Sequence, residues 1–219
     1  MWNSQVIIML LEGIRDTLYM TLASTLFGYI IGLPMGIVLT VTDKDGIRPN
    51  AAVYKVLDVI SNLLRRIPCI ILLIVLIPFT RFVVGRSYGS TATIVPLTIA
   101  AAPYIARMVE SSLKEVDAGV IEAARSMGAS DFQIVTRVML VEARTSLIVG
   151  ATISLGTILG YSAMAGTVGG GGLGDIAIRY GYTRWQTDIM VVTVVLLVIL
   201  FQIFQTIGMK IANRLDRRK

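Results

Sequence analysis

Long stretches without a charged side chain decide what this chain can fold into. Residues 17–42, 87–106, 145–174 and 189–209 contain no Asp, Glu, Lys, Arg or His. A helix of about 20 apolar residues crosses a hydrocarbon core of about 30 Å, and in lipid only helices and closed barrels satisfy their own backbone hydrogen bonds. The sequence therefore predicts an all-α integral membrane protein.

The composition excludes several classes of protein. Hydrophobic residues make up 55% of the chain and its mean hydropathy is +0.75, which is too apolar for an ordinary soluble domain. The chain has no histidine and one cysteine, Cys69, which excludes a disulfide within the chain and most zinc or histidine-based catalytic sites. The net charge of +6 comes from basic residues beside the apolar runs, which indicates a membrane surface rather than nucleic acid.

A fifth span is predicted at residues 58–81. Apolar residues recur at helical spacing from Val53 onward, with polar residues opposite them, which is typical of an amphipathic helix at the membrane surface. This helix leads into residues 67–80, an apolar run of 14 residues that is too short to cross a membrane alone. We expect the span to borrow residues at both ends, with Arg66 or Arg81 reaching the headgroups; an arginine facing a water-filled pathway is the alternative.

Five spans would place the two ends of the chain on opposite sides of the membrane. Of the 20 Lys and Arg residues, 15 then share the side of the C-terminus and five lie on the other side. Because basic residues favour the cytoplasmic side, we expect the N-terminus outside and the C-terminus in the cytoplasm. Residues 1–219 are predicted to form a single transmembrane domain with spans at 17–42, 58–81, 87–107, 143–165 and 188–210. The five basic residues predicted on the outer side are Arg15, Arg81, Arg86, Arg179 and Arg184.

Residues 115–142 form the longest charged segment between two predicted spans and are expected in the cytoplasm. Asp117 can cap the start of a helix, and Gly128 is a natural stop because a residue without Cβ adopts a positive φ at little cost. Ser130, with Gln133 three residues later, predicts a capping box for a second helix. We therefore expect a short helix, a tight break and a second helix that leads into the next span.

The short helix carries a family motif. Residues 122–124 read Glu-Ala-Ala, and Gly128 follows at the spacing of the EAA loop in permeases of ATP-binding-cassette (ABC) importers, which this segment resembles. The later hydrophobic positions of that motif are Val138 and Leu140 here. Val141 replaces its final proline, and we expect it to give the next helix a straighter start. The alternative is an ordinary amphipathic surface helix, but Gly128 at this offset, between two spans, favours the family motif.

The resemblance implies a fold and a set of partners. In this family of type I ABC importer permeases, the short helix docks into a groove of a cytoplasmic ATPase and transmits its closure. The implied partners are a second copy of the chain, two ABC ATPase subunits, an extracytoplasmic substrate-binding protein and membrane lipid, with no nucleic acid. No cofactor is expected in this chain, because ATP and Mg would be bound by the ATPase. The residues implied in coupling to that ATPase are Glu122, Ala123, Ala124, Arg125, Met127 and Gly128.

Most of the remaining chain resembles the permeases of methionine importers in particular. The resemblance is carried by residues 65–85, 94–110 and 161–174. It implies a permease subunit, without an ATPase site of its own, for an ATP-driven importer of L- or D-methionine in a bacterial inner membrane. Another small amino acid or a short peptide is the alternative substrate.

The translocation pathway is expected along the third and fourth spans. Pro96 and Pro103 in one span free backbone carbonyls, which are tolerated in a cavity wall, although packing kinks are an equal alternative. A methionine can adapt its shape as a soft gate, and ordinary packing is again the alternative. The candidate pathway residues are Pro103, Tyr161, Ser162 and Met164.

Residues 165–176 contain too many glycines to hold a helix and are predicted to form a pliable loop. Residues 175–188, rich in Tyr and Trp, suit a segment at headgroup level.

Two other functional classes fit the residues less well. An intramembrane enzyme would need paired acids, histidine or an activated nucleophile within the spans, and the four long uncharged stretches contain no Asp, Glu, Lys, Arg or His. A proton-coupled carrier would show such a residue or an inverted repeat. A channel or scaffold without an ATPase stays possible only if the EAA resemblance is accidental.

Overall fold

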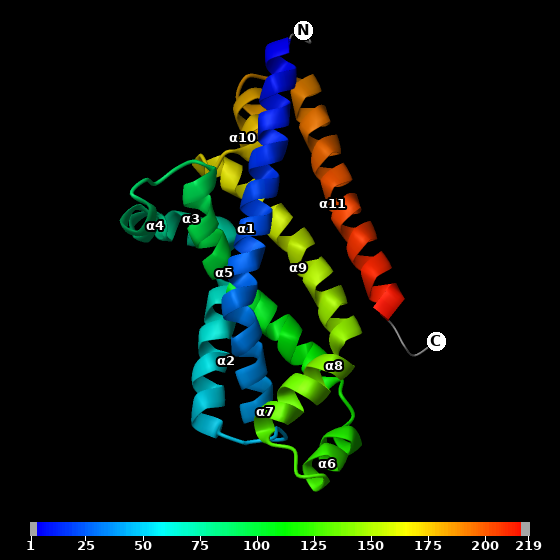
Figure 1. The fold of residues 1–219 in the computed structure, drawn as a ribbon. Helices are drawn as coiled ribbons and strands as arrows, with labels where there is room; N and C mark the ends of the chain where they lie inside the picture. Colours follow the sequence, from blue (N-terminus) through cyan, green and yellow to red (C-terminus); the bar gives the residue numbers. More distant parts are fainter. Residues whose placement is uncertain (1–3, 216–219) are drawn as a thin grey trace. The chain divides into compact units, whose positions relative to one another are not determined.

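The computed structural model describes residues 4–215, which form helices and contain no strand (Figure 1). Short π-helical and 3₁₀-helical segments interrupt the α-helices. Three of the basic residues predicted on the side of the C-terminus, Arg217, Arg218 and Lys219, lie outside the described residues. In chain order the elements are α1 (Ser4–Thr42), α2 (Ala51–Arg66), α3 (Cys69–Val75), α4 (Ile77–Val84), α5 (Ser90–Lys114), α6 (Ala118–Ser126), α7 (Asp131–Gln133), η1 (Ile134–Met139), α8 (Leu140–Glu142), α9 (Arg144–Ala165), η2 (Gly166–Val168), α10 (Gly172–Ile176), η3 (Ala177–Tyr182) and α11 (Thr187–Leu215).

Within residues 4–215, four helices are long and apolar enough to cross a membrane: α1, α5, α9 continued by η2, and α11. The prediction of five transmembrane helices is wrong, because residues 58–81 are divided among α2, α3 and α4 and form no single helix long enough to span. Pro68 precedes α3 in an extended conformation, and Leu76 separates α3 from α4. Since a proline disfavours helical backbone in the residue before it, a continuous helix cannot run through Ile67. The predicted amphipathic helix is confirmed as α2, which exposes Val56 and Leu63.

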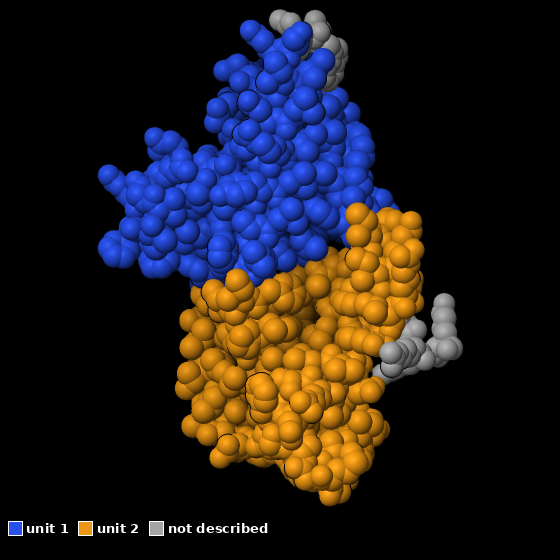
Figure 2. All heavy atoms as spheres, viewed as in Figure 1, with its two compact units in different colours: residues 1–28, 67–101, 155–205 blue, residues 29–66, 102–154, 206–219 orange. Residues whose placement is uncertain are grey.

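The chain divides into two compact units (Figure 2). Unit 1 contains residues 1–28, 67–101 and 155–205, and unit 2 contains residues 29–66, 102–154 and 206–219. Helices α1, α5, α9 and α11 each contribute residues to both units. Each unit is therefore assembled from segments that lie far apart in the sequence.

Unit 1 is held together by two buried apolar clusters. Both combine residues from α1 with residues that follow α9 or lie near its end. The members of the first cluster are Leu10, Leu173, Ile176 and Ile189, and those of the second are Met20, Leu73, Leu97 and Ala165.

The glycine-rich stretch of residues 165–176 is folded against α1. The sequence predicts a pliable loop without a helix, and this prediction is wrong, because η2 and α10 lie within the stretch. Gly171 and Gly172 have φ values of 82° and 74°, which L side chains rarely adopt, and they turn the chain into α10. The Leu173 N–H donates a hydrogen bond of 2.9 Å to the Thr17 hydroxyl, so the stretch is a packed part of unit 1.

In unit 2, two glycines let α1 approach α5 closely. A Cβ on Gly32 would lie 2.6 Å from the Ala102 carbonyl oxygen, and one on Gly36 would lie 2.5 Å from the Ala106 carbonyl oxygen and 2.7 Å from the Val109 Cβ. Small residues at a helix contact permit this approach in lipid, where packing rather than the hydrophobic effect drives association. Gly32 and Gly36 therefore bring α1 against the backbone of α5.

The start of α9 is irregular. The π-helical η1 precedes α8, and Ala143, with a ψ of 0°, separates α8 from α9. The Ala143 N–H still donates to the Met139 carbonyl, so the helical hydrogen bonding continues through the break. A π-turn is a common cause of helix bending, and the straighter start predicted from Val141 stays a prediction.

A matched pair of glycine substitutions tests the α1–α5 contact. We expect Gly36→Ala to lower the free energy of unfolding by about 1–3 kcal/mol, because the added Cβ meets backbone that cannot move aside. Gly160→Ala in α9 is the control: nothing among the described residues lies within 4 Å of the added Cβ, and alanine favours a helix by about 1 kcal/mol over glycine. Thermal unfolding of the purified protein in detergent measures both, and equal effects would contradict the contact.

Candidate functional site

Helix α6 begins at the predicted cap. The Asp117 carboxylate accepts a hydrogen bond of 2.8 Å from the Gly119 N–H, and Asp117 itself has extended backbone angles. This bond satisfies one of the N–H groups that have no partner within the helix. The predicted N-cap is confirmed.

Helix α6 ends in a Schellman motif around Gly128. The Ala129 N–H donates to the Ala124 carbonyl at 3.1 Å, and the Gly128 N–H donates to the Arg125 carbonyl at 3.0 Å. Gly128 has a φ of 82°, and a Cβ at this position would meet nothing within 4 Å among the described residues. The requirement for glycine here is therefore one of backbone conformation and not of space.

The helix that follows begins with the predicted capping box. The Gln133 N–H donates to the Ser130 hydroxyl at 3.4 Å, and the Ser130 N–H donates to the Gln133 side-chain oxygen at 2.9 Å. Both ends of the tight break are thus fixed by local hydrogen bonds. The short helix, break and second helix predicted for residues 115–142 are present in the structure.

Most of the predicted coupling residues are exposed. Glu122, Ala123 and Arg125 are exposed, and Met127 is 82% exposed. Ala124 is only 5% exposed and packs within the chain itself. Helix α6 therefore presents a carboxylate and a methionine on a narrow, small-residue surface, with Ala124 as its inner contact.

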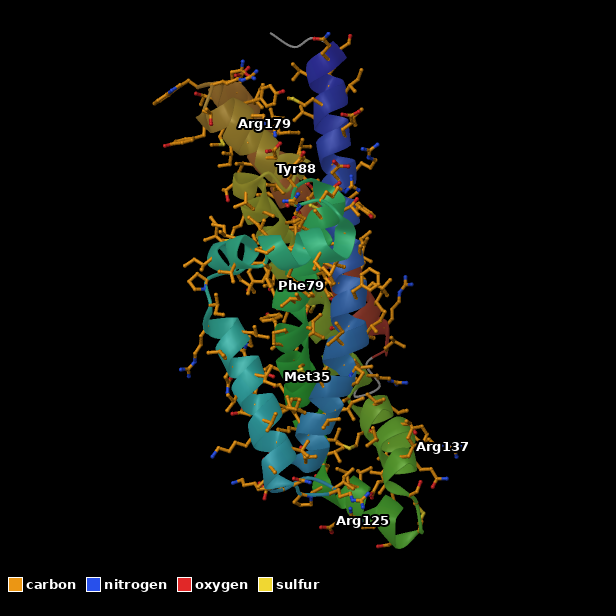
Figure 3. The ribbon with its side chains drawn as sticks, turned by 90° about the vertical axis from the view of Figure 1, so that its left-hand side faces the viewer. Met35, Phe79, Tyr88, Arg125, Arg137 and Arg179 are labelled. Atoms are coloured by element: carbon orange, nitrogen blue, oxygen red, sulfur yellow. The ribbon has the colours of Figure 1, made fainter. Side chains whose placement is uncertain are left out.

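Arg125 ties α6 to the loop that follows α1. Its guanidinium donates a hydrogen bond of 2.9 Å to the Ile47 carbonyl and lies 4.0 Å from the Asp131 carboxylate. Figure 3 labels the Arg125 side chain. A cavity of about 430 Å³ lies beside this contact in unit 2. Its polar lining includes Asp43, Lys114, Glu122 and Arg125.

A set of charged side chains joins α1, α2 and α5 in unit 2. Glu110 is 4% exposed, and its carboxylate accepts hydrogen bonds from Arg107 at 2.5 Å and from Lys114 at 2.8 Å. Arg107 also pairs with Asp58 of α2, and Lys114 pairs at 2.7 Å with Asp43, the residue after α1. We call these five residues the Glu110 cluster.

Tyr54 of α2 adds two further contacts to the Glu110 cluster. Its hydroxyl donates to Glu110 at 3.4 Å, and the Lys114 ammonium lies 5.8 Å from the centre of its ring.

The hydrogen bond from Lys114 holds the pKa of Asp43 below its usual value. A carboxylate whose pKa is lower in the folded protein than in the unfolded chain stabilises the fold above its usual pKa. The Asp43–Lys114 ion pair is therefore present at neutral pH and is lost only as the pH falls through the lowered pKa of Asp43.

Sequence reasoning missed the Glu110 cluster because it ended the third span at residue 107. The structure continues α5 to Lys114, which brings Glu110 into the buried part of the helix. The available signal was the spacing of Arg107, Glu110 and Lys114, which share one helix face at i, i+3 and i+7.

The candidate pathway residues are divided between the units. Pro103 is buried in α5 within unit 2, whereas Tyr161, Ser162 and Met164 lie on α9 within unit 1. The Ser162 hydroxyl is buried and lies 3.5 Å from the Thr21 hydroxyl, and Met164 is 50% exposed. Their grouping into one pathway stays a prediction. Within residues 4–215, no three His, Cys, Asp or Glu side chains are arranged to hold a metal ion.

Comparison with known proteins places the chain in a family. Residues 19–219 match the family described as binding-protein-dependent transport system inner membrane component. A probable D-methionine transport system permease protein MetI of Vibrio cholerae is 47% identical over 210 residues, covering 96% of this chain and 93% of that protein. The D-methionine transport system permease protein MetI of Escherichia coli is 52% identical over 158 residues, covering 72% and 73%.

Solved structures agree with this assignment. A chain of the MetNI methionine ABC transporter in an inward-facing conformation superposes with a TM-score of 0.97 at 48% identity, covering 99% of this chain and all of that chain. A chain of an amino acid ABC transporter crystallised with histidines has a TM-score of 0.78 at 20% identity, which shows the shared fold alone. The chain therefore belongs to the inner-membrane permease family of binding-protein-dependent transport systems, and it is a multi-pass bacterial inner-membrane protein with the type I ABC permease fold.

Substitutions at Gly128 test the end of α6. We expect Gly128→Val to speed amide hydrogen exchange at residues 127–129 about tenfold, because a β-branched residue in the left-handed region costs about 1–2 kcal/mol. Gly128→Asn is the matched control, since asparagine adopts this region more readily, and it should change the exchange much less. The same exchange rate in both variants would contradict a conformational requirement for glycine.

Proposed function

We propose that this chain is the permease subunit of an ATP-driven methionine importer. The observation that carries the proposal is the superposition on a chain of the MetNI methionine ABC transporter over 99% of this chain at 48% identity. Relatives named as D-methionine transport permeases, at about half identity, support the same substrate. Another small amino acid or a short peptide is the alternative, since the shared fold alone extends to transporters of other substrates.

The partners are proposed from the same comparison. We infer a homodimer of this chain with two ABC ATPase subunits and an extracytoplasmic binding protein that delivers the substrate. ATP and Mg would be bound by the ATPase subunits, so this chain would be a transport subunit without its own ATPase site and without a cofactor. Its role would be to convert closure of the ATPases into opening of a pathway at the dimer axis.

Helix α6 is the proposed coupling element. Glu122, Ala123, Arg125 and Met127 are exposed on a short helix whose two ends are fixed by hydrogen bonds. Such a preorganised protrusion loses little conformational entropy on docking into a groove of a partner. Ala124 would support the helix from inside, and Gly128 would supply the break after it.

The proposed orientation places α6 and the C-terminus in the cytoplasm and the N-terminus outside. It rests on the distribution of basic residues, 15 of 20 on the proposed inner side. Because four spanning helices alone would leave both ends of the chain on one side, this orientation requires α3 and α4 together to carry the chain across the membrane between α2 and α5.

Cysteine labelling tests this orientation. In a Cys69→Ser background, which removes the one native cysteine, Ser126→Cys places a thiol on α6 and Thr183→Cys places one after η3, both at exposed positions. A membrane-impermeant maleimide added to intact cells should label the cysteine at position 183 and reach position 126 only after permeabilisation. The reverse pattern would contradict the orientation.

Reconstitution tests the proposed function. We expect the chain in lipid vesicles, with the ATPase and binding protein of the same system, to import methionine when ATP is supplied to the ATPase side. Glu122→Arg and Gly128→Trp should each lower the import rate at least about tenfold, because the first reverses the anchoring charge and the second places a bulky residue in the left-handed backbone conformation that ends α6.

The matched control is Glu12→Arg, the same charge reversal at an exposed position of α1 in unit 1. It should import at the rate of the unmodified chain. Failure of the ATPase to bind, or normal import by both α6 variants, would contradict the proposal. Stimulation of ATP hydrolysis by a different amino acid would favour the alternative substrate.

A further inference from the structure

The Glu110 cluster lies close to the start of α6. Only three residues, 115–117, separate Lys114 at the end of α5 from the first residue of α6. Lys114 is held by both Glu110 and Asp43, so the chain enters this connection from a fixed point. The connection itself is short and contains a turn in which the Val116 N–H donates to the Leu113 carbonyl at 3.3 Å.

The far end of α6 is attached to the same region. Arg125 donates to the Ile47 carbonyl, and Ile47 lies in the loop that begins at Asp43. Within that loop, the Arg48 N–H donates to the Val41 carbonyl at 3.0 Å, which returns the loop to the end of α1. Both ends of α6 therefore lead, through short connections, to residues held by Lys114.

The cluster extends this attachment to α2. Arg107 pairs with Asp58 and also with Glu110, and Tyr54 donates to Glu110. The Glu110 carboxylate is thus the acceptor that Arg107, Lys114 and Tyr54 of α2 share. Its side chain is 5% exposed, so its ion pairs are far less screened by solvent than surface pairs are.

We propose that Glu110 is a positioning residue that makes α6 move together with the adjoining ends of α1, α2 and α5. The proposal rests on the proposed coupling role of α6. A displacement of α6 is passed on to three membrane-proximal helices as one body, because Arg125 attaches α6 to the loop after α1 and the ion pairs join the ends of α1, α2 and α5. Without the Glu110 carboxylate, α6 moves with the ATPase but the adjoining ends of α1, α2 and α5 no longer move with it.

The consequence is a change in coupling rather than in ATP hydrolysis. Removing one partner from a buried ion pair leaves the other charges uncompensated, which is more disruptive than removing a surface pair. In the full complex, Glu110→Gln should keep ATP hydrolysis but lower the number of methionine molecules imported per ATP about tenfold, within the usual range of coupling between linked sites. Glu110→Asp, which keeps the charge, should recover most of the import.

The experiment measures import and ATP hydrolysis in the same vesicles, together with the thermal unfolding midpoint of each complex. Glu12→Gln is the matched control, because it makes the same chemical change at an exposed carboxylate of unit 1. An unchanged ratio of import to hydrolysis in Glu110→Gln, with or without a lower unfolding midpoint, would overturn the proposal and leave the cluster a structural one.

A second variant covers poor folding of the first. Asp58→Asn acts at the cluster's half-buried edge, where the side chain is 30% exposed, and should lower the ratio in the same direction but less. If neither variant accumulates in the membrane, the cluster serves folding and the proposal is wrong. If the unmodified chain does not bind an ATPase at all, the proposed function fails first, and that result is distinguishable from a normal ratio in the variants.

Discussion

The hydrocarbon core of a membrane offers no hydrogen-bond partner to the backbone, and the rest of this structure depends on that constraint. Four helices of residues 4–215 are long and apolar enough to cross a membrane, and such helices are held together by close packing and by polar contacts between side chains. Gly32 and Gly36 supply the close packing in unit 2, where α1 lies against the backbone of α5. In unit 1 the Thr17 hydroxyl meets the N–H of Leu173 and so closes the glycine-rich stretch onto α1.

The region around α6 uses charge where the membrane segments use small residues. The N-cap at Asp117 and the Schellman motif at Gly128 make α6 a defined unit, and Arg125 and Lys114 attach it to the end of α1. Such an arrangement suits an element that receives force from a partner, because local hydrogen bonds keep its shape while ion pairs set its position. The family to which the chain belongs gives that force a source, namely the ATPase proposed as partner.

Local signals in the sequence were the most predictive ones. The caps of α6 and α7 were foreseen because a capping residue and a glycine stop act within four residues. The prediction of a fifth span was wrong because the apolar composition of residues 67–80 hides the breaks at Pro68 and Leu76.

The helix in the glycine-rich stretch depends on contacts with α1, more than 150 residues away in the chain, and the Glu110 cluster depends on where α5 ends. Both depend on contacts between distant parts of the chain, which the hydrophobic periodicity of the sequence does not reveal. The functional assignment came from the EAA motif together with the resemblance of residues 65–85, 94–110 and 161–174, and the pathway residues stay a prediction.

The most direct measurement of the central claim is a cross-link from α6 to the ATPase in the assembled complex. A photoreactive amino acid in place of Met127, which is 82% exposed, would react with whatever lies against α6 in the assembled complex. The account predicts an adduct with a peptide of the ATPase subunit, identified by mass spectrometry, in the complex that imports methionine. Adducts with lipid or water alone, from a complex that still contains the ATPase, would contradict the claim that α6 is the coupling element.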